Sequence, residues 1–428
     1  MNNERDVDLY RTLDGKSTEE LIEFIEQLQH AVDAADQLAQ RRLDRIEKLE
    51  RDREILRKRL AEATRLLRRY REHPAGRLTA KLLRTETSAE PPDATPEPSL
   101  ALAQSGLDRS PDRLRVATIL DGISDACWSP EFENIRLTRE TWDQALQDAA
   151  PDVLFVESAF GGSDGSWARR IAHFGSPHPD LAALVAAARN NGVPTVFWNK
   201  EDPVNYEWFV AAASLFDHVF TVDSNQIDRY RSDIDNTRVH PLPFAAQPEL
   251  HHPPDPTQHR DGSVGFAGTY YARKHAHRRE RMAMLLGPAL EHDLEIYDRM
   301  FGTDDPRFTW PPEFRPHVVG SVPYPEMGDV YRRHRAFINV NTVTDSPTMC
   351  ARRIFELAAC ATPIVSDYAM ALDYVPQGVV TVVNSAAEAA AVYSGLDEHP
   401  PAISHLGPEW IASGHTYGDR WRTITEQL

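Results

Sequence analysis

From residue 114 onward, short apolar runs alternate with longer stretches of helical spacing. In the first half of this region the helical stretches include residues 138–148 and 181–190. The apolar runs between them cover residues 115–120, 153–156, 195–198 and 218–222. Because helices cover both faces of a parallel sheet, its strands read as continuous apolar segments rather than as alternating ones. The pattern predicts a Rossmann-like α/β domain over residues 114–250.

A second series of the same kind follows a segment rich in Pro and His. Its apolar runs cover residues 264–267, 294–297, 317–319, 336–340 and 363–366. We expect a second Rossmann-like domain over residues 251–428. The predicted fold class is therefore α/β, with two facing Rossmann-like domains.

A different periodicity marks residues 17–75. Ser17 and Glu20 have the spacing of a capping box, and the apolar positions from Leu21 to Tyr70 recur at alternating steps of three and four residues. Such a seven-residue repeat is typical of a coiled coil and predicts a homo-oligomer, either dimer or trimer. A solitary solvated helix is the alternative. Residues 1–16 read as a tail.

Residues 76–113 read as a linker. Residues 77–84 are basic and amphipathic, which favours continuation of the preceding helix over contact with an anionic membrane. Residues 88–98 are rich in Pro, Glu and Thr, a composition typical of a flexible connection.

Composition narrows the class of protein. The 428 residues include 47 Lys and Arg against 65 Asp and Glu, and the formal net charge of −18 argues against general nucleic-acid binding. No apolar run is long enough to span a membrane, and the acidic N-terminus lacks the apolar core of a secretory signal. Cys127, Cys350 and Cys360 form no disulfide framework. These features predict a cytoplasmic protein.

The segment from Ser346 to Pro363 carries the most informative chemistry. Ser346 and Pro347 predict the start of a helix that follows the strand at residues 336–340 and ends before Pro363. In a parallel sheet this helix start lies where ligands bind, and its free N–H groups favour an anion. We therefore place a phosphate at the first turn, whose residues include Thr348 and Met349.

Three charged side chains follow on this helix. Arg353, beside Arg352, adds positive charge, and Glu356 shares a face with both arginines. A carboxylate beside a phosphate site is electrostatically unfavourable unless it holds hydroxyl groups, and a nucleotide sugar supplies both phosphate and hydroxyls. A surface Arg/Glu pair without a ligand is the alternative.

Two further segments have features of a ligand site. Gly268 ends the apolar run 264–267, and Arg273 and Lys274 follow in the next loop, where backbone and cationic groups would approach a pyrophosphate. Lys200, Glu201 and Asp202 stand together after the run 195–198, at a strand end that would face the ligand crevice. We expect catalytic roles for these three residues; a structural cluster of ion pairs is the alternative.

Two sequence motifs carry a resemblance to known proteins. Residues 355–365 (FELAACATPIV) resemble the E-A-x-A-C-G-T-P-V-V signature of group 1 glycosyltransferases, which have two facing Rossmann-like domains of the GT-B type. Residues 197–203, with 156–160 and 216–223, resemble the spore-maturation (CgeB-like) branch of that family.

The resemblance implies several roles. Glu356 would hold the ribose of a nucleotide sugar, the loop with Tyr324 would receive the base, and the last segment, from about residue 410, would cross back over the first domain. The family often has an acidic residue eight positions before this Glu, near the transferred sugar. Here that position is Thr348, which leaves the usual sugar contact and the stereochemical course open.

The sequence thus predicts a glycosyltransferase that moves a sugar from a nucleotide-sugar donor to a glycan, lipid-linked or protein acceptor. Glu201 or Asp202 would act as the acceptor-side base or stabilise charge on the sugar. No metal is expected, because the spacing of the histidines at 251, 252, 275 and 277 matches no zinc set and no Asp-x-Asp motif stands at a strand end. A sugar-nucleotide epimerase of the same fold and a non-catalytic coiled-coil scaffold are the alternatives.

Overall fold

The computed structural model describes residues 113–428, apart from 256–259, 261–262, 304 and 399–404. The predicted coiled coil and almost all of the linker after it lie outside the described residues. Within the described part no helix is long and apolar enough to cross a membrane.

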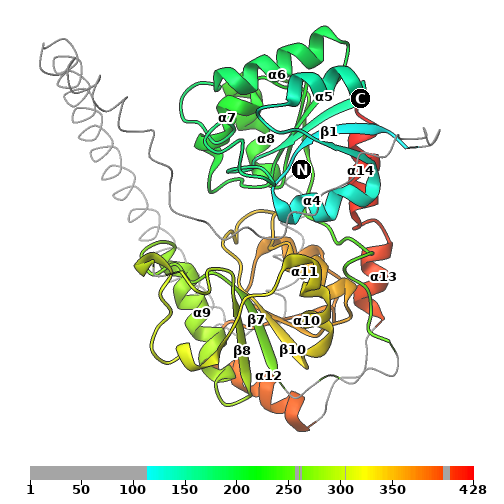
Figure 1. Ribbon diagram of the computed structural model, residues 1–428. Helices are drawn as coiled ribbons and strands as arrows, with labels where there is room; N and C mark the ends of the chain where they lie inside the picture. Colours follow the sequence, from blue (N-terminus) through cyan, green and yellow to red (C-terminus); the bar gives the residue numbers. More distant parts are fainter. Residues whose placement is uncertain (1–112, 256–259, 261–262, 304, 399–404) are drawn as a thin grey trace, which may run out of the picture. The chain divides into compact units, whose positions relative to one another are not determined.

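The first sheet has six parallel strands in the order β2-β1-β3-β4-β5-β6. Figure 1 shows this sheet, with β1 labelled, among its helices. The strands are β1 (Arg115–Ile119), β2 (Glu133–Arg136), β3 (Val153–Glu157), β4 (Thr195–Asn199), β5 (His218–Thr221) and β6 (Val239–Pro241). The helices are α4 (Gly122–Trp128), α5 (Trp142–Ala149), α6 (Pro179–Asn190), α7 (Tyr206–Ala213) and α8 (Ile227–Ile234).

The second sheet also has six parallel strands, in the order β12-β11-β10-β7-β8-β9. They are β7 (Val264–Gly268), β8 (Leu294–Asp298), β9 (Val318–Gly320), β10 (Ala336–Asn339), β11 (Ile364–Ser366) and β12 (Val380–Val382). The helices of this part are α9 (Ala276–Ala289), α10 (Met327–Arg333), α11 (Arg353–Ala359) and α12 (Ala386–Glu398), followed by α13 (Leu406–Ala412) and α14 (Tyr417–Thr425).

The two predicted series of strands are confirmed, each strand within one or two residues of its predicted bounds. The sequence pattern missed β2, β6 and β12. All three lie at sheet edges and are partly exposed, so they lack the continuous apolar run that identifies a strand covered on both faces.

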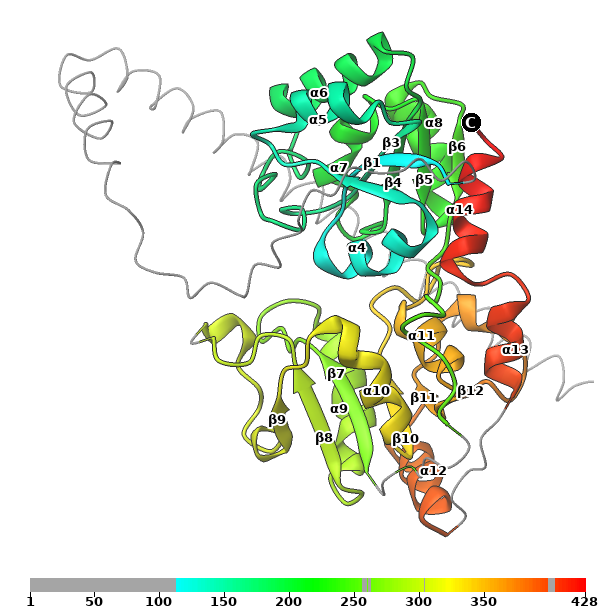
Figure 2. The same ribbon diagram turned by 45° about the vertical axis from the view of Figure 1, so that its right-hand side comes forward.

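The last two helices connect the two sheets through aromatic side chains. On α13, Trp410 stacks on Phe355 of α11 with ring centroids 5.3 Å apart. On α14, Tyr417 meets Trp128 edge to face at 4.8 Å, and Trp421 lies 4.7 Å from Phe132. The end of the chain therefore packs first on the second domain and then on the first (Figure 2).

One expected element starts later than predicted. The helix expected from Pro347 begins only at Arg353, and residues 347–352 are not helical. Ser346 Oγ donates a hydrogen bond to Asp223 Oδ1 at 2.6 Å and accepts one from the N–H of Met349 at 2.9 Å. Thr348 Oγ1 donates to the carbonyl of Val222 at 2.8 Å. The bonds to Asp223 and Val222 anchor Ser346 and Thr348 to the first domain, and the chain bends without forming a helix before Arg353.

A glycine in α10 tests how tightly this helix packs. A Cβ at Gly328 would stand 2.1 Å from the carbonyl oxygen of Leu250, so Gly328→Ala must displace backbone. We expect a loss of ~1–3 kcal/mol in the free energy of unfolding, measured by urea denaturation. Gly395→Ala in α12 is the matched control, because a Cβ there meets nothing within 4 Å and alanine favours a helix. Equal stability of the two variants would contradict the described packing.

Candidate functional site

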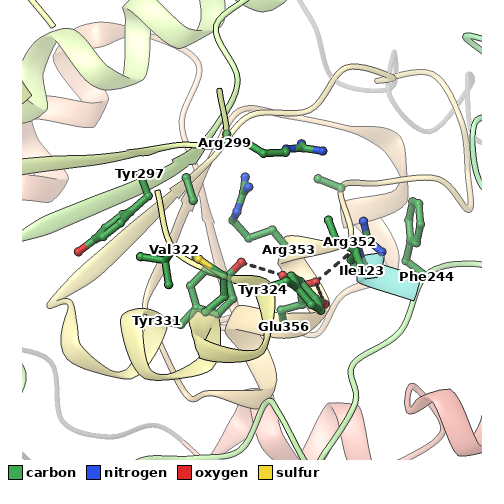
Figure 3. Close-up of a pocket in the computed structure, with 14 residues that line it drawn as sticks. Ile123, Phe244, Tyr297, Arg299, Val322, Tyr324, Tyr331, Arg352, Arg353 and Glu356 are labelled. Carbon is green, nitrogen blue, oxygen red and sulfur yellow. Dashed lines mark hydrogen bonds and ion pairs between the residues drawn. The ribbon is translucent and has the colours of Figure 1, made fainter. Parts of the chain in front are cut away.

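A cavity of about 390 Å³ opens at the carboxyl ends of the strands of the second sheet (Figure 3). Two of its lining residues, Ile123 and Phe244, come from the first domain and from the segment after β6. The others belong to the second domain: Ala267, Gly268, Tyr297, Arg299, Val322, Tyr324, Met327, Tyr331, Ala351, Arg352, Arg353 and Glu356. The strand ends of a parallel sheet are where this fold class binds ligands.

The carboxylate of Glu356 is fixed at the wall of this cavity. The hydroxyl of Tyr324 donates to Oε1 at 2.6 Å and that of Tyr331 donates to Oε2 at 2.8 Å. Arg352 Nε lies 3.5 Å from Oε1. Burial alone would raise the pKa of Glu356, but His251, Arg352 and the two tyrosines lower it overall. Because each carboxylate oxygen has two lone pairs, an ionised Glu356 retains the capacity to accept hydroxyl donors from a ligand.

Cationic groups lie close to the same carboxylate. Arg353 Nε is buried and makes no hydrogen bond to any residue that the structure describes. Burial, together with the neighbouring Arg353 and Arg299, lowers the pKa of Arg278 to about 10. Mutual repulsion of this kind disfavours the unliganded arrangement and favours an anion between the groups.

Gly268 brings the backbone to the edge of this cationic group. It ends β7 with a φ of +153°, a conformation that side chains rarely adopt. A Cβ here would stand 3.2 Å from the ring of Phe266 and 3.7 Å from Arg278 Nη2. The absence of a side chain keeps the strand end open beside Arg278.

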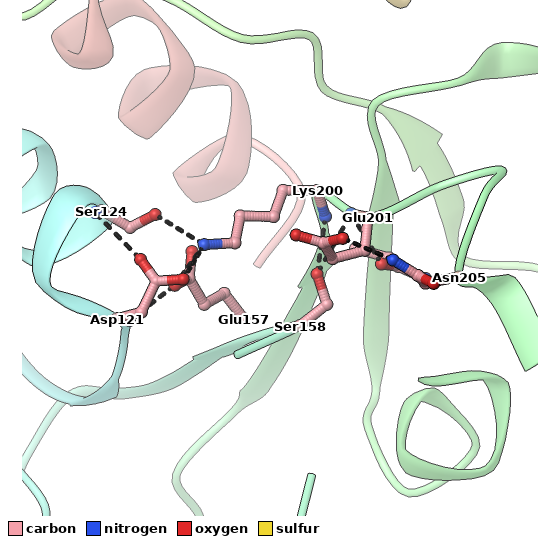
Figure 4. A network of polar contacts seen from close by, with 8 residues as sticks. Asp121, Ser124, Glu157, Ser158, Lys200, Glu201 and Asn205 are labelled. Carbon is pink, nitrogen blue, oxygen red and sulfur yellow. Dashed lines mark hydrogen bonds and ion pairs between the residues drawn. The ribbon is translucent and has the colours of Figure 1, made fainter. Parts of the chain in front are cut away.

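A second polar cluster lies at the carboxyl ends of β1, β3 and β4 (Figure 4). Lys200 Nζ donates to Glu157 Oε1 at 3.0 Å and also forms an ion pair with Asp121. Glu157 Oε1 also accepts the N–H of Asp121 at 2.6 Å. Burial and then the Asp121 charge raise the pKa of Glu157 to about 7. Asp121 is the accessible carboxylate of this cluster, because its side chain is 34% exposed whereas that of Glu157 is fully buried.

The three predicted catalytic residues separate in the structure. Lys200 joins the cluster just described, whereas Glu201 is partly buried and accepts a hydrogen bond from Asn205 Nδ2 at 2.7 Å. The Asp202 carboxylate is fully buried and accepts hydrogen bonds from Thr221, Asn199 and Tyr230. Its partners are all within the first domain, which favours a structural role for Asp202.

Of the residues predicted to bind the nucleotide sugar, some line the cavity and others lie outside it. Gly268, Tyr324, Arg353 and Glu356 line the cavity. Arg273 and Lys274 are exposed in the loop after β7 and are not among the lining residues. Thr348 is bonded to the first domain, and Met349 packs against the apolar core.

Sequence reasoning gave no specific role to Arg278, Arg299, Asp121 or Glu157. Arg278 lies in the first turn of α9, which begins at Ala276, and its Nη1 donates to the carbonyl of Thr269 at 3.1 Å. Arg299 directly follows β8, Asp121 lies two residues after β1, and Glu157 ends β3. That position was a usable signal, but charged residues at the ends of apolar runs are common in this fold class.

No cluster of three or more His, Cys, Asp or Glu side chains suited to a metal ion occurs among the described residues. The three cysteines are free and buried. His251 lies against Tyr324, with ring centroids 5.8 Å apart, and His275 belongs to the exposed loop before α9.

Comparison with known proteins gives one family match, which covers part of the chain. A family model described as glycosyl transferase-like matches residues 275–426. This range begins just before α9 and includes Arg278, Arg299, Arg353 and Glu356. No curated protein matches the chain.

Several solved structures are similar to the chain at low identity. Anabaena Alr3699/HepE in complex with UDP has 12% identity and a TM-score of 0.47, over 73% of this chain and 91% of its own. The T4 phage BGT in complex with UDP and Mn²⁺ has 13% identity and a TM-score of 0.41, over 73% and 95%. UDP-GlcNAc 2-epimerase from Neisseria meningitidis, bound to UDP-GlcNAc, has 12% identity and a TM-score of 0.41, over 73% and 99%. Similarities of this size do not identify a ligand or a reaction.

The buried carboxyl of Glu157 makes stability depend on pH. Its pKa of about 7 in the folded state lies above the ordinary 4.5, so its stabilising effect is present below pH 4.5 and is lost as the pH rises through 7. We expect Glu157→Gln to remove this loss: the free energy of unfolding of the wild type, relative to the variant, should fall between these pH values. Chemical denaturation at a series of pH values measures it.

Asp121→Asn provides a control of opposite sign. Burial would raise the pKa of Asp121, but Lys200 and Arg352 lower it overall, so its stabilising effect is lost as the pH falls through the lowered value. If the free energy of unfolding of the wild type, relative to each variant, changed with pH in the same direction for both variants, the described network would be wrong.

Proposed function

We propose that the protein is a glycosyltransferase that uses a nucleotide-sugar donor, and that the donor binds in the cavity beside α11. The observation that carries this proposal is the juxtaposition, in one cavity, of Glu356, a fixed carboxylate, with the buried Nε of Arg353, which has no hydrogen-bond partner in the part of the chain that the structure describes. A ligand that satisfies both must present hydroxyl donors next to an anion. The match of residues 275–426 to a glycosyl transferase-like family supports this choice of ligand.

The cationic side of the cavity would bind the diphosphate. Arg353 and Arg299 line the cavity, and Arg278 stands behind the strand end at Gly268. Guanidinium groups bind phosphate oxygens through paired N–H donors and stabilise the negative charge that develops as the sugar leaves. Three such groups supply the charge that a divalent cation would otherwise provide, and we therefore propose metal-independent transfer.

The opposite side of the same cavity would bind the nucleoside. Glu356 would accept the ribose hydroxyls, while Val322, Met327 and the ring of Tyr324 form an apolar wall suited to a base. Tyr324 also donates to Glu356, so the ribose and the base would contact groups that are fixed relative to each other. Such positioning is a large part of catalysis in a transfer between two bound substrates.

The acceptor would enter from the first domain. Ile123 of this domain lines the donor cavity, and Asp121 lies two residues before it, within the electrostatic influence of Arg352. In the reaction, an acceptor oxygen forms a bond to the anomeric carbon, the bond from this carbon to the diphosphate breaks, and Asp121 takes the acceptor proton. We assign this role to Asp121 rather than to the buried Asp202. Glu201 remains a candidate for contact with the acceptor.

The role of Glu356 is tested by pairing a protein change with a ligand change. Wild-type protein should bind UDP, GDP or ADP, and the nucleotide that binds should lose about 10–100-fold in affinity when both ribose hydroxyls are removed, because hydrogen bonds to a charged group are worth ~1.5–3 kcal/mol. Glu356→Gln should bind the natural nucleotide more weakly and no longer distinguish it from the dideoxy analogue. Isothermal titration calorimetry measures all four affinities.

Two outcomes would contradict this assignment. If none of these nucleotides binds, the proposed donor class is wrong. If Glu356→Gln still prefers the natural ribose as strongly as the wild type does, the carboxylate does not hold it. Thermal unfolding of the variant is the control for folding, since Glu356 is buried.

The diphosphate site makes a second prediction. Arg353→Met should reduce the preference of the protein for the nucleoside diphosphate over the nucleoside, because it removes a phosphate-directed charge without enlarging the cavity much. Arg273→Met, a change of the same type in an exposed loop, should have a smaller effect. Transfer activity, or slow hydrolysis of the donor, should persist in EDTA. A larger effect of Arg273→Met, or loss of activity in EDTA, would contradict the arrangement.

A further inference from the structure

A cluster of exposed apolar side chains lies on the first domain, outside the cavity just described. Phe160, Phe174, Val204 and Trp208 are 51%, 64%, 48% and 48% exposed, and we call these four residues the aromatic platform. Single exposed apolar residues are normal on protein surfaces, but exposed apolar side chains that touch one another, as Phe174 and Trp208 do, mark an interaction site. Among the described residues of the first domain, Leu114 is the remaining large apolar side chain with comparable exposure.

The platform is built by two adjoining segments. Phe160 and Phe174 belong to the segment after β3, whereas Val204 and Trp208 belong to the turn after β4 and to α7. The rings of Phe174 and Trp208 meet at 5.9 Å, and the N–H of His173 donates to the carbonyl of Trp208 at 2.9 Å. Phe160 packs edge to face on the buried Phe209 at 5.3 Å. The rings are therefore held in place rather than free in solvent.

The platform adjoins the polar residues assigned to the acceptor side. Ser158 Oγ accepts the N–H groups of Lys200 and Glu201 at 2.9 and 3.2 Å, which joins the ends of β3 and β4 (Figure 4). Phe160 lies two residues beyond Ser158, and Val204 lies three residues beyond Glu201. A ligand on the platform would therefore have its polar groups near Glu201 and toward Lys200 and Asp121.

We infer that the aromatic platform binds saccharide units of the acceptor, an inference that rests on the proposed glycosyl transfer. Pyranose rings present apolar C–H faces that stack on aromatic side chains and hydroxyls at the rim that bind carboxylates and amides. The platform offers this combination. It has three exposed aromatic rings, the N–H of Trp208 donates to the carbonyl of Asn205 at 3.0 Å, and Asn205 Nδ2 donates to the Glu201 carboxylate at 2.7 Å.

Local charge favours a neutral saccharide over an anionic membrane. The two segments that build the platform, residues 158–178 and 200–209, contain three Lys or Arg and four Asp or Glu. Docking on anionic lipid requires an excess of Lys and Arg beside the apolar side chains. This surface has no such excess of positive charge, and an uncharged polyhydroxyl chain does not require one.

The test uses full-length protein and neutral hexasaccharides: maltohexaose, cellohexaose, laminarihexaose and chitohexaose. Titration calorimetry should detect binding of at least one of them at millimolar concentrations. Trp208→Ala and Phe174→Ala should each weaken this binding by about tenfold, equivalent to 1.4 kcal/mol. Tyr374→Ala, which removes an aromatic side chain that is 72% exposed on the second domain, should leave it unchanged.

Nucleotide affinity separates this inference from the proposed function. Trp208→Ala should bind UDP, GDP or ADP as the wild type does, which also shows that the variant is folded. Wild-type protein that binds a nucleotide but none of the hexasaccharides would overturn the platform assignment and leave the donor site standing. Hexasaccharide binding that is unchanged in both platform variants would overturn it as well. So would Trp208-dependent sedimentation with vesicles of phosphatidylcholine and phosphatidylglycerol in place of saccharide binding.

Discussion

The site depends on one largely buried ion pair, between Arg352 at the N-cap of α11 and Glu356 within the helix. Removing two charges from water is costly, and attraction between them compensates only when the remaining donors and acceptors find partners. Glu356 meets this condition through the hydroxyls of Tyr324 and Tyr331. Arg352 meets this condition only in part. Its guanidinium lies over the rings of Phe244 and Tyr324, 5.3 and 5.8 Å from their centroids. Its Nη1, however, has no hydrogen-bond partner among the described residues. The pair thus links the helix, the segment after β6 and the loop before α10.

The opposite face of α11 explains why the helix can hold such a pair. Ile354, Leu357 and Ala358 are buried in the apolar core, and Phe355 stacks on Trp410 of α13. This packing fixes the axis and rotation of a short helix that would not be stable in isolation. The charged side chains therefore project from a rigid support, which the proposed binding of ribose and diphosphate would require.

Sequence patterns predicted the inner strands of both sheets because burial on both faces leaves continuous apolar runs. Helical spacing predicted that Glu356 and Arg353 lie near each other, and both line the same cavity. The start of α11 was wrong because Ser346 and Thr348 bond to Asp223 and Val222, more than a hundred residues earlier in the chain. Arg278 was passed over in favour of Arg273 and Lys274 because the direction of a side chain depends on where α9 begins. The association of Asp121 and Glu157 with Lys200 depends on the order of β1, β3 and β4 in the sheet, which local periodicity does not encode.

The two polar clusters have opposite character, and this bears on how a proton would leave the acceptor. The cluster proposed to bind the donor is rich in guanidinium groups, whereas the cluster proposed to face the acceptor has two carboxylates and one ammonium group. Lys200 and Arg352 keep the pKa of Asp121 low, so that it is ionised and available but a weak base. A weak base is sufficient if the hydroxyl becomes acidic as it bonds to a sugar with oxocarbenium character, and proton transfer then follows bond formation. Glu157 has a pKa near neutrality, and Lys200 contacts both carboxylates. When Asp121 is protonated, Glu157 would therefore become more ionised.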